Sequence, residues 1–123
     1  VAACAVLVIY ALNLRRVNRP WAEESGMSET IVTQLQEFAE GKDYKWVFIH
    51  GLPDTYRGAY VFRNGIDTAI KLFVSEDLVF PPHGNISLQE WTERSAQRRR
   101  DPGAYPEILL LRWDSTARRL VAP

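Results

Sequence analysis

The first fourteen residues of the chain carry no charge, and three arginines follow within the next five positions. A helix that spans a membrane needs roughly 20 apolar residues to cross about 30 Å of hydrocarbon, whereas fourteen residues cover about 21 Å. We therefore expect residues 1–14 to be the end of a transmembrane helix whose other turns lie upstream. Residues 15–19 form its predicted basic anchor, with Arg15, Arg16, Arg19 and Trp21 at the membrane interface.

Two other structures are compatible with the same apolar run. A short apolar segment is also typical of a buried parallel strand or a core helix in a free-standing α/β domain, because periodicity does not separate these cases. A signal peptide is the third alternative, but its charges precede the apolar core, and no small-x-small cleavage site follows the run here. The membrane helix is the preferred interpretation, and it makes the lipid bilayer a predicted partner through the N-terminal segment.

The remaining residues, 20–123, suffice for one small domain with its own core. Fifteen basic residues balance fifteen acidic ones in the whole chain, so no overall positive field indicates nucleic acid as a partner. The charges are unevenly spread: residues 94–119 contain seven arginines and three acids, whereas residues 23–43 contain six acids and one lysine. Cys4 is the only cysteine, so no disulfide forms within the chain.

Hydrophobic periodicity and turn residues divide the domain into seven elements. Helices are predicted over residues 28–40, 59–73 and 87–100, and strands over residues 44–50, 78–80, 107–113 and 119–122. Ser28 and Ser87 are the predicted N-caps. This order predicts an α/β fold, a small layered domain with a mixed four-stranded sheet and about three helices, ending in an antiparallel hairpin. The core is expected to contain Trp46, Phe48, Phe62, Ile70, Leu109 and Leu111.

Residues 59–73 carry two conflicting signals. Asn64-Gly65 is a strong hairpin signal. Apolar residues at helical spacing point the other way, and these are Ala59, Phe62, Ile66, Ala69, Ile70 and Phe73. We predict a helix and accept a cost of about 1 kcal/mol for Gly65 inside it.

The loop over residues 50–58 contains the densest polar chemistry of the chain. His50, Asp54, Tyr56 and Arg57 are the candidate ligand-binding residues, since loops after the strands of open α/β sheets commonly bind ligands. The structural alternative is that Asp54 caps the next helix and that the proline and glycines of the loop only make turns. No phosphate-binding glycine motif, nucleophile motif or paired-cysteine metal motif is present, so we predict no catalytic residue, no metal site and no cofactor in this chain.

Three segments together resemble a known type of protein. They are residues 18–22 (NRPWA) after the apolar helix, residues 52–65 (LPDTYRGAYVFRNG) after a hydrophobic strand, and residues 111–114 (LRWD) near the end. The chain resembles the soluble C-terminal tail of large bacterial polytopic membrane proteins grouped with the dolichyl-phosphate-mannose mannosyltransferase-like (GT-C) glycosyltransferases. The acidic residues of that family lie near the start of its membrane portion, so none is carried over to this chain.

The resemblance implies a non-catalytic C-terminal domain of a multispan enzyme that uses a lipid-linked sugar donor. The rest of that membrane protein would be a second partner. The resemblance also implies an extracytoplasmic domain, whereas the arginines directly after the apolar run favour the cytoplasmic side; we expect the extracytoplasmic side. The alternatives are a membrane-anchored binding or interaction module without an enzyme, and a free-standing soluble α/β domain.

Overall fold

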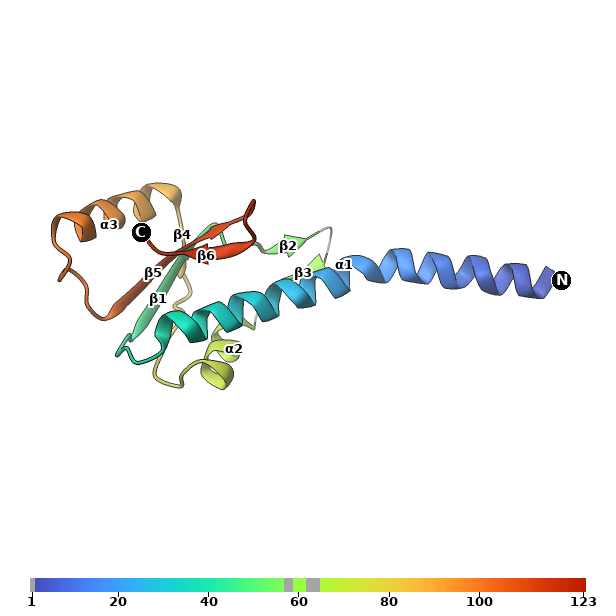
Figure 1. Ribbon diagram of the computed structural model, residues 1–123, viewed down its shortest axis with the longest axis horizontal. Coiled ribbons are helices and arrows are strands. Elements are labelled where there is room, and N and C mark those ends of the chain that lie inside the picture. Colours follow the sequence, from blue (N-terminus) through green and yellow to red (C-terminus); the bar gives the residue numbers. More distant parts are fainter. Residues whose placement is uncertain (1, 57–58, 62–64) are drawn as a thin grey trace.

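The computed structural model describes residues 2–56, 59–61 and 65–123, and it shows a three-layer α/β domain from which one helix extends (Figure 1). Two helices cover one face of a four-stranded mixed sheet and the third covers the other face, which confirms the predicted fold class. The elements are α1 (Ala2–Ala39), β1 (Trp46–His50), β2 (Thr55–Tyr56), β3 (Ala59–Tyr60), α2 (Ile66–Phe73), β4 (Asn85–Ile86), α3 (Leu88–Arg100), β5 (Ile108–Asp114) and β6 (Arg119–Val121).

Helix α1 is continuous from Ala2 to Ala39, so the predicted start at Ser28 is wrong. The helix also runs through the predicted boundary between residues 1–19 and 20–123. Proline removes one backbone hydrogen bond, but the turns on both sides of it remain helical. Ser28 is no N-cap, because its hydroxyl donates to the Glu24 carboxylate at 2.8 Å and to the Val61 carbonyl at 3.0 Å.

The sheet has the strand order β4-β1-β5-β6. Strands β1 and β5 pair in parallel over five residues, from Trp46 opposite Ile108 to His50 opposite Arg112. Strand β4 is parallel to β1, and β6 is antiparallel to β5. The predicted terminal hairpin is therefore confirmed, and the sheet is mixed as expected.

The edge strand differs from the prediction for residues 78–80. Only Val79 pairs there, in an isolated parallel bridge with Trp46, and the strand itself is Asn85–Ile86. Pro81 and Pro82 interrupt the edge because proline has no N–H to donate to the ladder. Pairing with β1 resumes at Gly84, whose carbonyl accepts a hydrogen bond from Ile49 N at 2.8 Å.

The predicted helix over residues 59–73 is confirmed only in its second half, and the first residues of that range belong to a hairpin other than the one that Asn64-Gly65 signals. The helix α2 covers only Ile66–Phe73, and the predicted part before it is wrong, since Ala59–Tyr60 pairs with Thr55–Tyr56 in a β2–β3 hairpin. Gly65 is the N-cap residue of α2 rather than part of a hairpin turn. Asn64 and Phe62 lie outside the described residues.

The main core lies between the sheet and the pair α1 and α2. Ile31 and Leu35 of α1 are fully buried against alternate residues of the central strands, and these are Val47, Ile49, Leu109 and Leu111. The predicted core residues Ile70, Leu109 and Leu111 are confirmed. Trp46 was a wrong prediction, because it is 41% exposed.

Phe48 also lies outside the main core, contrary to the prediction. Phe48 alternates with the core residues Val47 and Ile49, so it points to the α3 face, where it is half-buried and the Arg94 guanidinium lies 4.7 Å from its ring centroid. A strand that packs helices on both faces has apolar side chains on both, so alternation of polarity does not identify the face of the main core.

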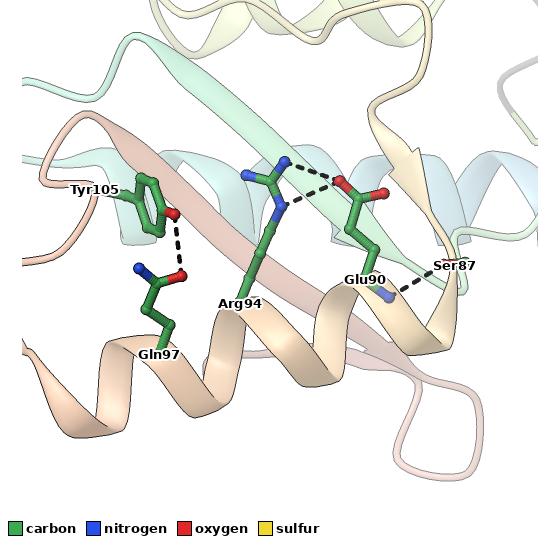
Figure 2. Close-up of polar contacts among 5 residues, drawn as sticks. All are labelled: Ser87, Glu90, Arg94, Gln97 and Tyr105. Atoms are coloured by element: carbon green, nitrogen blue, oxygen red, sulfur yellow. Dashed lines mark hydrogen bonds and ion pairs between the residues drawn. The ribbon is translucent and has the colours of Figure 1, made fainter.

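Polar side chains cap helix α3, pair along it and join it to the loop that follows (Figure 2). The predicted cap is confirmed, with Glu90 N donating to Ser87 Oγ at 3.1 Å, while the Glu90 carboxylate pairs with Arg94 at 2.8 Å. The Tyr105 hydroxyl donates to the Gln97 side chain at 3.0 Å. These contacts fix the start of α3 and the loop after it, whereas the Arg98 guanidinium connects α3 to the sheet by donating to the Ile108 carbonyl of β5 at 2.7 Å.

Leu111→Ala should lower the free energy of unfolding by about 2–5 kcal/mol, because its side chain is fully buried between β5 and α1. The matched control is Leu72→Ala on α2, where the leucine is 71% exposed and the expected change is within about 0.5 kcal/mol. Urea unfolding followed by circular dichroism measures both. Equal losses for the two variants would contradict the assignment of the core face.

Candidate functional site

The chain reverses its direction of winding between β1 and β4, which are adjacent and parallel. After β1 it passes through α2 on one face of the sheet, whereas after β4 it passes through α3 on the other face. Adjacent strands whose connections leave on opposite faces create a crevice at their carboxyl ends, which is where open α/β sheets usually bind ligands. The loop after β1, predicted as the ligand site, lies at this crevice.

His50 ends β1 and connects it to β4. Its Nδ1 lies 2.8 Å from the carbonyl oxygen of Ile86, and since a carbonyl only accepts, Nδ1 donates in this contact. The ring is half-buried. His50 therefore joins the carboxyl ends of β1 and β4. This contact is structural, whereas the sequence predicted a ligand contact for His50.

Asn85 is a contact residue that the sequence reasoning missed. Its amide nitrogen donates to the Leu52 carbonyl at 3.2 Å, and its amide oxygen accepts from Leu52 N at 3.3 Å. This two-point contact fixes the beginning of the loop against β4. An asparagine after Gly84 and next to a strand is a weak signal in the sequence, because such residues are common in turns.

The other predicted ligand residues are only partly described. The Asp54 side chain is exposed, and strand β2 follows it, so the alternative in which Asp54 caps a helix is wrong. Tyr56 belongs to β2 by its backbone, and Arg57 lies outside the described residues. In the described part of the chain, no hydrogen bond joins His50 to Asp54. The two predicted ligand residues therefore do not form one hydrogen-bonded site.

A cleft of about 760 Å³ opens beside this loop, between the beginning of α2 and residues 79–82. Leu52, Phe80 and Asp54 are among the residues that line it, together with Asp67. The hydrogen bond from Lys71 lowers the pKa of the Asp67 carboxyl, and a backbone hydrogen bond from Phe80 lowers it further against partial desolvation. The Asp67 carboxylate is thus paired within the protein, and among the described lining residues Asp54 is the other charged group.

The N-terminal half of α1 is the second candidate site. All its large hydrophobic side chains are exposed, with 48–66% of their surface accessible, and they are Val6, Leu7, Val8, Ile9, Tyr10, Leu12, Leu14 and Val17. Arg15 and Arg16 follow the apolar residues, Arg19 pairs with Glu23 at 2.7 Å, and Trp21 is 52% exposed. Along the described residues, every helix falls short of the length or the apolarity of a membrane-crossing segment.

Comparisons of the chain with protein-family models, with curated proteins and with solved structures find no match. Within residues 2–56, 59–61 and 65–123, no group of three or more His, Cys, Asp or Glu side chains is placed to hold a metal ion. The two features of the described structure that bear on function are therefore the exposed apolar half of α1 and the cleft beside the β1 loop.

Asn85→Ala should lower the free energy of unfolding by about 0.5–1.5 kcal/mol, since it removes both hydrogen bonds to the Leu52 backbone. Asp54→Ala, in the same cleft, should change it by less than about 0.5 kcal/mol because that side chain is exposed. Thermal and urea unfolding measure the difference. A larger loss for Asp54→Ala than for Asn85→Ala would show that the carboxylate, not the amide, organises the loop.

Proposed function

We propose that this chain is a membrane-anchored α/β domain whose α1 inserts its N-terminal half into a lipid bilayer. The observation that carries the proposal is the exposure of residues 2–14, which contain no charged side chain and extend away from the domain (Figure 1). Exposed apolar area of this extent is costly in water, at about 25 cal/mol per Å². A bilayer removes that cost.

The distribution of apolar residues around α1 supports a bilayer over a protein partner. A helix that packs on one protein surface has an apolar stripe and a polar opposite face, whereas a helix that is apolar on all sides suits a membrane. Residues 2–12 contain no polar side chain other than the Tyr10 hydroxyl and the Cys4 thiol. The all-round pattern therefore favours lipid.

The residues after the apolar segment support a membrane interface. Residues 2–14 cover about 20 Å of helix, and Arg15, Arg16 and Arg19 follow at once. Long basic side chains near a helix end reach into the headgroup region. Trp21, exposed on the next turn, is of the type enriched at that depth.

For the whole protein we propose a glycosyltransferase-like membrane enzyme with a lipid-linked sugar donor, on the sequence resemblance given above. The present domain would be its extracytoplasmic, non-catalytic tail, in contact with the rest of that protein. An architectural role is supported by the resembling segment 111–114, which lies in β5. Trp113 is buried in the core, and the Asp114 carboxylate accepts from Thr116 N at 2.9 Å and Ala117 N at 3.0 Å.

A Leu7→Asp/Ile9→Asp variant should lose vesicle binding. Each aspartate in the apolar segment should cost about 2.5–3.5 kcal/mol of insertion free energy. Flotation with phosphatidylcholine vesicles measures the bound fraction. The matched control is Leu72→Asp/Leu88→Asp, which changes two equally exposed leucines of the domain and should float like the wild type. Loss of flotation in the control alone would place the membrane contact on the domain instead.

Sugar transfer by the full-length protein tests the non-catalytic role. In membranes containing that protein, Asp54→Ala should leave the rate of transfer from a lipid-linked donor within about twofold of wild type, well below the tenfold loss that about 1.4 kcal/mol of lost transition-state stabilisation would cause. A loss of tenfold or more with unchanged thermal stability would make the loop a site of chemistry. Absence of transfer by the wild type would favour the anchored binding module.

A further inference from the structure

The cleft beside the β1 loop lies where an open α/β sheet usually binds ligands, at the carboxyl ends of two strands whose connections leave on opposite faces. Its volume of about 760 Å³ is within the range of pockets that hold a small molecule. Most of its lining residues are apolar, and Leu52, Ile66 and Phe80 are among them. The cleft therefore has the position, the size and the composition of a ligand pocket.

The wall formed by the β1 loop is fixed by hydrogen bonds. The Asn85 side chain contacts both the N–H and the carbonyl of Leu52, as described above. Two residues further along, the Asp54 carbonyl accepts a hydrogen bond from Val61 N at 2.9 Å. The backbone that carries the Asp54 side chain is thus held on both sides.

Residues 79–82, which also line the cleft, are fixed as well. Phe80 N donates to the Asp67 carboxylate of α2 at 3.3 Å, and Gly84 N donates to the Pro81 carbonyl at 2.8 Å. The Phe80 ring lies directly against Gly84, since a Cβ atom added at Gly84 would be 2.8 Å from two ring carbons. A cleft whose walls are already held needs little ordering when a ligand binds, and this favours affinity.

The charges of the cleft favour a cation. Asp67 and Lys71 form an ion pair at 2.8 Å, so their charges cancel. The Asp54 side chain is exposed, and among the residues that the structure describes none donates a hydrogen bond to its carboxylate or pairs with it. An unpaired carboxylate beside apolar surface attracts a cation that has an apolar body, and it repels an anion.

We propose that this cleft binds a small organic cation, a molecule with an apolar body and one ammonium group. The apolar body covers the lining at Leu52, Ile66 and Phe80, and the ammonium group donates to the Asp54 carboxylate. This inference goes beyond the proposed membrane anchoring and does not depend on it, because the lining residues all belong to the domain and not to the apolar half of α1.

The test is a titration of the isotope-labelled full chain in phosphatidylcholine nanodiscs, followed by the amide NMR shifts of Leu52 and Ile66. Three probes are compared: benzylamine, benzyl alcohol, which has the apolar body without the charge, and methylamine, which has the charge without the apolar body. Benzylamine should bind most tightly. Asp54→Asn should weaken benzylamine binding about threefold to fivefold and leave benzyl alcohol binding unchanged. The matched control is Asp43→Asn, an exposed aspartate before β1, which should behave like the wild type.

The other outcomes overturn the inference. If benzylamine shifts neither amide, the cleft is not a site for an organic cation. Equal benzylamine binding by the wild type and Asp54→Asn removes the carboxylate from the site, and equal binding of methylamine and benzylamine removes the apolar contact. Vesicle flotation of Asp54→Asn should equal that of the wild type, so failure of this inference and failure of the membrane anchoring are observed separately.

Discussion

Burial of Ile31 and Leu35 against the parallel pair β1 and β5 is the interaction on which the rest of the structure depends. Both side chains are fully buried, and they contact the face of the sheet formed by Val47, Ile49 and Leu111. Because α1 is one uninterrupted helix, this packing also sets the direction in which its apolar N-terminal half leaves the domain. The core and the proposed membrane segment are thus parts of one rigid element.

The two faces of the sheet are stabilised by different physics. The α1 and α2 face is aliphatic and closely packed, whereas the α3 face combines Phe48 with Arg94 and Trp91 with Arg112, whose guanidinium lies 5.2 Å from the indole. In the part of the chain that the structure describes, three buried polar atoms on this face have no hydrogen-bond partner: Trp91 Nε1, Ser95 Oγ and Arg112 Nε. The α3 face thus combines aromatic, cationic and polar groups where the opposite face is aliphatic.

The carboxyl edge of the parallel strands leads into the candidate ligand loop and into a turn that lies beside α1. Strand β5 leads from this edge into the turn beside α1, and β1, which is parallel to β5, leads into the loop with Asp54. With α1 inserted into the bilayer as proposed, this edge faces the membrane. The cleft beside the loop would then open on the side of the proposed membrane.

The sequence alone determined the features that depend on local chemistry. Residue type and spacing were enough to predict the charge-free run with its arginines, the Ser87 cap of α3, the long strand β5 and its antiparallel hairpin with β6.

The tertiary structure decided three features that the sequence did not reveal. They are the passage of α1 through Pro20, the core face of β1, and the edge strand at Asn85 instead of residue 79. The core face of β1 and the position of the edge strand are selected by surfaces far away in the chain. Pro20 loses one local hydrogen bond, but the helical turns on both sides of it continue to the Ile31 and Leu35 contacts. Phe48 and Ile49 are equally apolar in sequence, and only the positions of α1 and α3 give them different neighbours.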